Sequence, residues 1–176
     1  MLIAHNVNLE LVRADRCGSG KQFYCPACKN KVILKQGSIK RPHFAHLNVS
    51  DCETFSENES LLHLESKYLL EKTGRELGWN CTLEKVFSNI SQRADLFIQF
   101  GDQSLAIEFQ QSPISDEEIF KRNSGYERIG LPFIWLLGPN YPINKLKEHT
   151  AAKFSDRSGH IFCFDAKDNI RILKDF

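Results

Sequence analysis

Apolar and polar positions alternate regularly from residue 57 onward, and this pattern predicts most of the secondary structure. Residues 57–77 have helical periodicity, and Gly78 follows them as a stop signal. The stripe expected to face the core consists of Leu62, Leu69, Thr73 and Leu77. Three strand-like segments follow, near 80–88, 93–100 and 104–111, with Gly101 and Asp102 at the turn between the last two.

The second half of the chain continues with another helix and further strands. Ser115 and Glu118 form a capping box, which predicts a helix that ends at Gly130. The apolar run 132–137 is typical of a strand covered on both faces, and we expect it to join the sheet in parallel through a right-handed crossover. Residues 143–176 predict a short helix, then strands near 160–165 and 170–174 joined by a turn through Asp168 and Asn169. From residue 57 the order is helix, three strands, helix, strand, which predicts an α/β sandwich with a mixed sheet.

Composition limits the class of protein. The chain has 176 residues, of which 41% are hydrophobic and 26% charged, as in soluble globular proteins. Its formal net charge of +1 means that any basic surface for nucleic acid has to be local. No apolar run approaches the length of a membrane span, and no signal-peptide core follows Met1, so we expect a cytoplasmic protein with no membrane partner.

Residues 1–56 differ from the rest and predict a small zinc-binding module. This segment contains four of the six cysteines and the basic run 35–41. Two close ligand pairs separated by fourteen residues are typical of a tetrahedral, structural zinc site. The four ligands we predict are Cys25, Cys28, His43 and His46. Cys17 and Cys52 are alternatives, and Cys52 is near enough to replace one histidine; a metal-free pair of reduced cysteines in a loop is the simpler interpretation.

Polar residues interrupt two of the predicted strands in residues 57–176. Asp95 follows Arg93 and Ala94, and Glu108 and Gln110 share one face of the next strand because alternate residues point the same way. Burying two carboxylates is costly unless their charge is compensated. Oxygen ligands select Mg²⁺ or Mn²⁺, so Asp95 and Glu108 are candidate metal ligands. The alternative is a sheet whose polar face meets water.

The first predicted helix carries Glu59, His63 and Lys67 at four-residue spacing, and so on one face. Such spacing usually belongs to a solvated helix surface. Next to a metal held by two carboxylates, however, these side chains suit phosphodiester cleavage. The metal would polarise the phosphate and activate water, and a cation would offset charge in the transition state.

Several separate motifs then occur in a specific order. They are 23–28 (FYCPAC), 42–46 (PHFAH), 59–67 (ESLLHLESK), 93–95 (RAD) and 106–115 (AIEFQQSPIS). In these motifs, between about residue 20 and about residue 138, the sequence resembles the CoiA-like competence proteins. The central domain of that family is a predicted nuclease of the PD-(D/E)XK superfamily.

The resemblance implies a restriction-endonuclease-like core: a helix, three antiparallel strands, a helix and a strand, preceded by a zinc-finger-like module. It also implies that Asp95 and Glu108 hold the metal, that Glu59 supports them, and that Gln110 occupies the place of the usual catalytic lysine. Gln110 has no charge, so the missing cation would come from Lys67, or from the second helix. The residues of that helix that could contact phosphate or DNA are Lys121, Arg122 and Tyr126.

Three hypotheses follow. The first is a DNA nuclease dependent on Mg²⁺ or Mn²⁺, with a structural Zn²⁺ in residues 1–56, acting in DNA uptake, recombination, processing or defence. The second is a non-catalytic DNA-binding accessory factor on a degenerate nuclease fold, favoured by Gln110. The third is a zinc-stabilised protein-interaction module with an inert sheet. Recombination or defence proteins are further expected partners.

Overall fold

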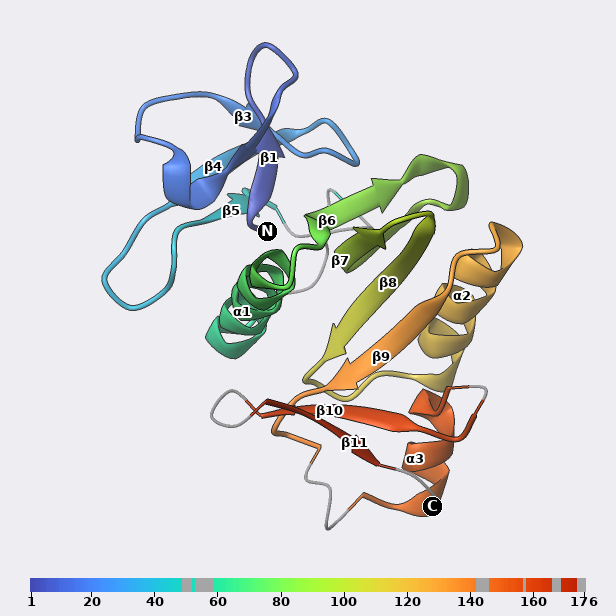
Figure 1. Ribbon diagram of the computed structural model, residues 1–176. Helices are drawn as coiled ribbons and strands as arrows, with labels where there is room; N and C mark the ends of the chain where they lie inside the picture. The colour runs from blue at the N-terminus through green and yellow to red at the C-terminus, as the bar shows by residue number, and fades with distance from the viewer. Residues whose placement is uncertain (49–51, 53–58, 142–145, 157, 166–168, 174–176) are drawn as a thin grey trace.

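Two β-sheets form the framework of the molecule (Figure 1). The computed structural model describes residues 1–48, 52, 59–141, 146–156, 158–165 and 169–173. The first sheet has the strand order β2-β1-β3-β4-β5, and all its pairings are antiparallel. Its strands are β1 (Ile3–His5), β2 (Leu11–Arg13), β3 (Phe23–Tyr24), β4 (Lys31–Lys35) and β5 (His43–His46). A short 3₁₀ helix, Ala14–Arg16, follows β2.

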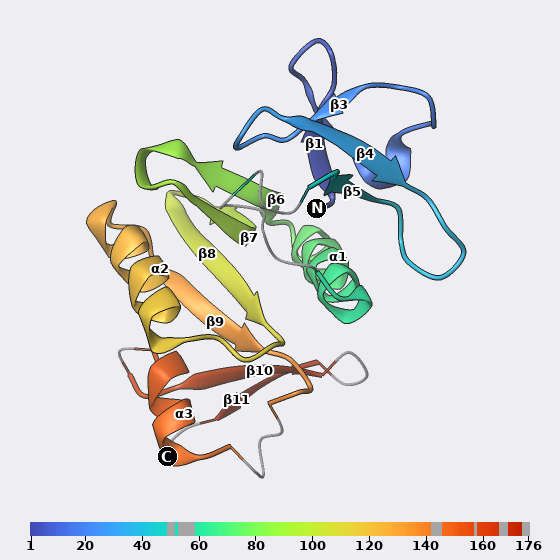
Figure 2. The same ribbon diagram turned by 180° about the vertical axis from the view of Figure 1, so that it is seen from behind.

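The second sheet contains the remaining strands in the order β11-β10-β9-β8-β7-β6. These strands are β6 (Asn80–Phe87), β7 (Gln92–Phe100), β8 (Gln103–Gln110), β9 (Phe133–Leu137), β10 (Ile161–Asp165) and β11 (Asn169–Leu173). Strands β6, β7 and β8 pair antiparallel, β9 joins β8 in parallel, and β10 joins β9 in parallel. The helices are α1 (Leu61–Glu76), α2 (Asp116–Arg128) and α3 (Glu148–Phe154). Helices α1 and α2 cover opposite faces of this sheet (Figures 1 and 2).

The predicted order of elements from the first helix to β9 is confirmed, including the parallel pairing of β9. Ser115 caps α2, since its Oγ accepts a hydrogen bond from the Glu118 N–H, and Gly130 after the helix has a φ of 64°. The helix thus ends where glycine adopts a left-handed conformation without steric cost. The predicted Asp168 lies outside the described residues.

Helix α1 differs from its prediction in two respects. It begins at Leu61, because Ser60 is the N-cap and accepts a hydrogen bond from the His63 N–H, so Glu59 precedes the helix. The predicted apolar stripe was also wrong: Leu69, Thr73 and Leu77 are exposed. The buried residues of α1 are His63, Leu64, Ser66, Lys67, Leu70, Glu71 and Gly74. Charged residues can occupy this buried face because each has a partner of opposite charge on another element.

Ion pairs attach the first sheet to α1. Arg13 at the end of β2 donates to both oxygens of Glu71, at 2.6 and 2.5 Å. Arg41, just before β5, donates to both oxygens of Glu65, at 3.0 and 2.7 Å. The Arg41–Glu65 pair is bidentate, through two guanidinium nitrogens, and such pairs fix orientation as well as distance. The first sheet is therefore held at two points on the helix that carries His63.

Candidate functional site

The β7–β8 ladder ends where the site begins. Its last pair towards the site is Leu96 with Ile107, and the next residues on the two strands are Asp95 and Glu108. Beyond that pair a side chain takes over the role of a backbone acceptor, because the Phe109 N–H donates to Asp95 Oδ2 at 3.0 Å. The local break in the ladder therefore fixes the Asp95 carboxylate at the junction of two central strands.

Asp95 turns towards α1 and meets two other predicted site residues. His63 Nε2 lies 3.1 Å from Asp95 Oδ2. One ligand atom from each of Glu59, His63 and Asp95 lies within 4.8 Å of the others. Two ligands on one ion at about 2.0–2.6 Å each are at most about 5 Å apart, so the spacing fits a shared cation. Two carboxylates with one imidazole suit Mn²⁺ and, through their oxygens, Mg²⁺. This acidic group could bind a metal.

Two buried cations already compensate these carboxylates. Lys67 Nζ donates to Glu59 and, at 2.6 Å, to Glu84, and it lies 3.7 Å from Asp95 Oδ1. Arg93 lies 3.5 Å from Glu59 and 3.7 Å from Asp95. Lys67 and Arg93 thus lie side by side next to Asp95, and the role of Lys67 as the substitute cation stays a prediction.

The charges of this cluster determine its pKa values. Burial alone would raise the pKa of Glu59, Glu84 and Asp95, but the surrounding cations outweigh it and lower all three. For Asp95 the main opposing charges are His63 and then Lys67. Burial alone would lower the pKa of Lys67, but the three carboxylates raise it. The lysine therefore stays charged, and the buried carboxylates around it stay ionised.

Glu84 was missed by the sequence analysis, although it is central to the network. It lies in β6 opposite Asp95, between the pairs Leu83–Leu96 and Lys85–Ala94, and its φ is 52°. Left-handed backbone is uncommon for a residue other than glycine and marks a strained position. The antiparallel register, which pairs β6 with the Asp95 strand, was the one sequence signal that could have indicated it.

Glu84 also connects the cluster to the first sheet. Its Oε2 accepts hydrogen bonds from the backbone N–H groups of Leu2 and Ile3, at 2.8 and 3.1 Å, while Oε1 accepts from Lys67. The Met1 amino group adds a contact to Glu59 at 2.9 Å. The first sheet thus closes one side of the acidic group.

Glu108 lies apart from this group and has its own partners on α2. Arg122 donates to one of its oxygens at 2.9 Å, and the Tyr126 hydroxyl donates to the other at 2.5 Å. Burial raises the pKa of Glu108 to about 7, and the nearby Asp95 charge adds to that rise, against the opposing effect of Arg122. Among the described residues, the acidic group that could bind a metal contains Asp95 and does not contain Glu108. The shared Asp95–Glu108 metal stays a prediction.

The other predicted residues of α2 and β8 have varied surroundings. Arg122 and Tyr126 do face the sheet together, but they hold the Glu108 carboxylate, and Tyr126 is fully buried. Lys121 is exposed. The Gln110 amide donates to the Ser112 carbonyl at 2.5 Å, so it points along its own loop.

The second candidate site lies in the first sheet and its loops. Four side chains gather within 4.8 Å of one another: Cys25, Cys28, His46 and Cys52. The Cys25 and Cys52 sulfurs are 3.9 Å apart, and Cys28 Sγ lies 3.4 Å from His46 Nε2. Tetrahedral zinc with bonds of about 2.3 Å to sulfur and 2.0–2.1 Å to nitrogen requires about 3.8 and 3.6 Å. The donor set and spacing therefore fit zinc, and this cluster could bind a metal.

His43 is the one predicted zinc ligand that the structure leaves out of this cluster, and Cys52 takes its place. The physical reason is the strand β5: His43 and His46 are three residues apart, and residues at odd spacing point to opposite faces. His46 lies on the face of the buried Phe44. His43 instead donates from Nδ1 to the Arg41 carbonyl at 2.9 Å. Cys17, the other alternative, is likewise outside the cluster.

Without a cation the cysteine cluster lacks compensation. Burial raises the pKa of the Cys25 thiol to about 12, and the neighbouring Cys52 adds to the rise. Metal ligation needs thiolates, which a bound cation stabilises directly. The groups that shift the pKa of Cys25 include no lysine or arginine, in contrast to those that shift the carboxylates of the acidic group. The positive charge that the Cys25 thiolate needs would come from the bound metal.

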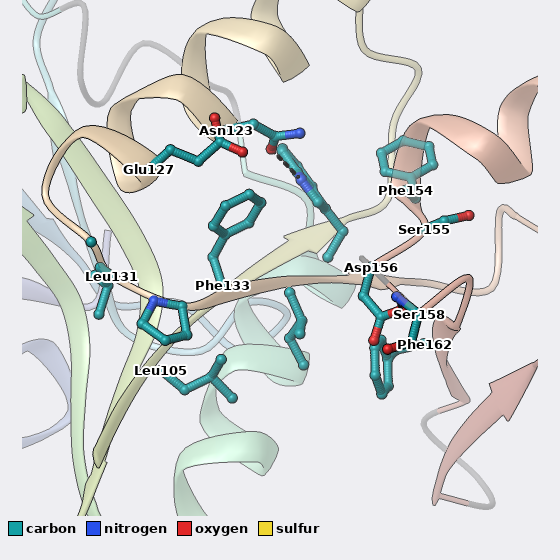
Figure 3. Close-up of a pocket in the computed structure, with 14 residues that line it drawn as sticks. Leu105, Asn123, Glu127, Leu131, Phe133, Phe154, Ser155, Asp156, Ser158 and Phe162 are labelled. Carbon is teal, nitrogen blue, oxygen red and sulfur yellow. Dashed lines mark hydrogen bonds between the residues drawn. The ribbon is translucent and has the colours of Figure 1, made fainter. Parts of the chain in front are cut away.

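A cavity of about 530 Å³ lies elsewhere, between the end of α2, β9, α3 and β10 (Figure 3). Phe133, Phe154 and Phe162 line it together with polar groups, and Asn123 accepts a hydrogen bond from Trp135 Nε1 at 2.8 Å. The residues that line this cavity include neither the acidic group nor the cysteine cluster. Its size alone does not make it the site of chemistry.

Comparisons with known proteins agree with this architecture and define a protein with a nuclease-like domain. The model of the nuclease-like domain of competence protein CoiA matches residues 59–173, and the model of the CoiA N-terminal domain matches residues 6–55. The chain belongs to the competence protein CoiA family. The described helices include none long and apolar enough to cross a membrane.

Two curated relatives are similar over the central part of the chain. Competence protein CoiA of Bacillus subtilis (strain 168) is 34% identical over 121 residues, which are 67% of this chain and 32% of that protein. Druantia protein DruB of Escherichia coli (strain UMEA 4076-1) is 26% identical over 113 residues, or 57% of this chain and 20% of DruB. The chain thus spans about a third of the length of one relative and a fifth of the other.

Proposed function

We propose that this protein is a DNA nuclease that depends on Mg²⁺ or Mn²⁺. The observation that carries the proposal is the buried group of Glu59, His63 and Asp95 at the point where β7 and β8 separate, within a domain matched by a nuclease-like family model. Buried, ionised carboxylates that converge with an imidazole are typical of a site that holds a divalent cation. The restriction-endonuclease-like core is part of the same proposal.

Each residue has a role in this proposal. A bound divalent ion would supply the positive charge that polarises the phosphate and lowers the pKa of water. Glu59 and Asp95 would hold it, and His63 fixes the orientation of Asp95 through the 3.1 Å contact. Lys67 and Arg93 lie within 4 Å of Asp95 and would offset negative charge on the phosphate, the task that Gln110 cannot perform. Glu108, held by Arg122 and Tyr126, would be the second carboxylate once it ionises.

In the first sheet, we propose that Cys25, Cys28, His46 and Cys52 hold a structural Zn²⁺. Four protein ligands leave no open position for substrate, so the ion would stabilise the fold. The names of the relatives suggest settings in competence or in a Druantia system, and DNA uptake, recombination or defence are the settings we propose.

A second candidate function, a non-catalytic DNA-binding accessory factor, has one observation in its favour. Both Glu108 oxygens are already bonded within the protein, and Gln110 bonds to its own loop, so two expected catalytic positions are occupied. In that case the charged cluster would serve only to hold α1 against β6 and β7.

Cleavage of labelled single-stranded and double-stranded DNA, with Mg²⁺ and with Mn²⁺, separates the two functions. Wild-type protein with its zinc content verified should cleave at least one form, and Asp95→Ala should not. If wild type cleaves neither form with either ion, the accessory function replaces the nuclease. DNA affinity should then be almost the same in wild type and Asp95→Ala.

A further inference from the structure

Charge is distributed unevenly along the chain. Residues 16–50 contain seven lysines and arginines and no aspartate or glutamate, although the whole chain has a formal net charge of +1. The basic residues are Arg16, Lys21, Lys29, Lys31, Lys35, Lys40 and Arg41. The rest of the chain is therefore net negative. A local basic segment on a protein of nearly neutral charge is the electrostatic footprint of a polyanion-binding surface.

Part of this basic segment lines a groove at the β4–β5 hairpin. The groove has a volume of about 460 Å³ and is lined by residues 35–40 and His43. Lys35 and His43 are cross-strand partners at the mouth of the hairpin, and Lys35 and Lys40 are exposed. Burial lowers the pKa of His43, and the charges of the Met1 amino group, Lys40 and Lys35 lower it further.

The groove also carries an unusual apolar side chain. Ile39 is 83% exposed, between basic residues on the loop, and makes part of the groove wall. An exposed isoleucine costs solubility and has no packing role here. In DNA-binding proteins, apolar side chains beside cations contact bases or sugars while the cations contact phosphates.

The base of the hairpin is fixed to the catalytic helix. Besides its two bonds to Glu65, the Arg41 guanidinium carbon lies 3.7 Å from the ring centre of Tyr68, and both partners lie on α1. In Figures 1 and 2 the loop between β4 and β5 extends on the α1 side of the first sheet. A DNA strand bound by this loop would therefore be bound by a hairpin that is attached to α1, the helix of His63 and Lys67.

We propose that the groove of the β4–β5 hairpin binds the backbone of DNA. Lys35 and Lys40 contact phosphates, and Ile39 contacts a base or sugar between them. The role of this groove in delivering substrate rests on the proposed nuclease function, whereas binding itself does not. His43, absent from the cysteine cluster, belongs to this surface.

Fluorescence anisotropy with a labelled DNA of about 20 nucleotides, single-stranded and duplex, tests the proposal. Divalent ion is omitted so that cleavage cannot occur, and no chelator is added so that zinc is retained. The test variant is Lys35→Ala with Lys40→Ala. The matched control is Lys72→Ala with Lys85→Ala, which removes two lysines from α1 and β6 that are also exposed. Lys35→Arg with Lys40→Arg keeps the charges, and Ile39→Ser tests the apolar contact.

The test variant should bind on the order of tenfold more weakly near 0.1 M salt, and its log–log salt slope should be less steep by about 2, because two phosphate contacts are lost. The control and the arginine variant should bind like wild type, and Ile39→Ser should weaken binding without changing the slope.

Wild-type protein that binds no DNA, or a test variant that binds as well as wild type, would overturn the proposal. If the test variant binds and cleaves DNA like wild type, the nuclease function stands and only the DNA-binding role of the groove is rejected. Conversely, normal groove-dependent binding without any cleavage would support the groove and refute the nuclease.

Discussion

The cysteine cluster of the first sheet and the acidic group of the second differ in how their charge is balanced. Cys25, Cys28, His46 and Cys52 converge, and burial keeps the Cys25 thiol protonated in the absence of a cation. The acidic group instead has Lys67 and Arg93 within hydrogen-bond or ion-pair distance of its carboxylates. Under the proposed function, a metal would therefore serve the structure of the first region and only the chemistry of the second.

Glu84 joins the two regions. It accepts a hydrogen bond from Lys67, which also donates to Glu59 of the acidic group, and hydrogen bonds from the backbone N–H groups of Leu2 and Ile3 at the start of the first sheet. Loss of the first sheet would expose this carboxylate and the group behind it to water. We expect damage to the cysteine cluster to reach the acidic group, and damage to the acidic group to leave the cysteine cluster folded.

The largest expected effect is loss of zinc. Cys25→Ser and Cys52→Ser should each lose the ion and unfold the first sheet, because structural zinc contributes about 10–16 kcal/mol in zinc-finger peptides. Elemental analysis and hydrogen exchange of residues 1–48 measure both results. His43→Ala is the matched control and should keep its zinc. Zinc retained by Cys52→Ser but lost by His43→Ala would restore the ligand set expected from the sequence and contradict the cluster.

The next largest effect concerns catalysis at the acidic group. Asp95→Ala should reduce DNA cleavage by on the order of 10³-fold or more, since the loss of a metal-holding carboxylate removes several kcal/mol of transition-state stabilisation. Glu108→Ala should also abolish cleavage, and Glu108→Gln should be nearly as severe because it keeps shape but loses charge. Zinc content should be unchanged in all three. Normal cleavage by Asp95→Ala would show that the acidic group is not the catalytic centre.

The buried cation should matter for stability as well as rate. Lys67→Met leaves Glu59 and Glu84 without their main partner, and breaking a buried ion pair from one side costs about 3–5 kcal/mol. Urea unfolding measures this loss. Lys72→Met, at an exposed position of the same helix, should change the unfolding free energy by no more than about 0.5 kcal/mol. Equal stabilities of the two variants would mean that the acidic group does not depend on its own cations.

The protonation of Glu108 should give the protein a distinct pH dependence. Its pKa is about 7 when folded against an ordinary 4.5, so between these values the folded state holds a proton that the unfolded chain has released. Stability from this residue should therefore fall as pH rises from 4.5 to 7, by at most about 1.4 kcal/mol per pH unit. Glu108→Gln should remove this slope, which thermal unfolding at several pH values would detect. An identical slope in both proteins would assign the effect to another group.

The smallest effect is expected at Gln110. Gln110→Ala should lower cleavage by less than about tenfold, because its amide orients the Ser112 loop and carries no charge for the transition state. Gln110→Lys should retain activity. Steady-state cleavage rates under saturating metal measure both variants. A loss as large as that of Asp95→Ala would give the glutamine a direct role in metal binding or chemistry.

The order of elements from α1 to β9 was predictable because turn, cap and alternation signals are local. The convergence of Glu59, His63 and Asp95 also followed from local spacing and motif order, although Glu59 lies before the helix. Two features were not predictable in this way. Cys52 was an alternative ligand in the sequence, but its exchange for His43 depends on the geometry of β5, which directs His43 to the other face. Glu84 reaches Lys67, beside the acidic group, from a left-handed backbone position within β6, and only the antiparallel pairing of β6 with the Asp95 strand pointed to it.

Titration of Mn²⁺ into zinc-loaded protein, with free Mn²⁺ followed by electron paramagnetic resonance, tests most directly whether the acidic group is a metal centre distinct from the cysteine cluster. Wild-type protein should bind about one Mn²⁺, and Asp95→Ala should bind none, while both keep the same zinc content. Wild-type protein that binds no Mn²⁺, or an Asp95→Ala variant that binds it equally well, would contradict a catalytic metal at Glu59, His63 and Asp95.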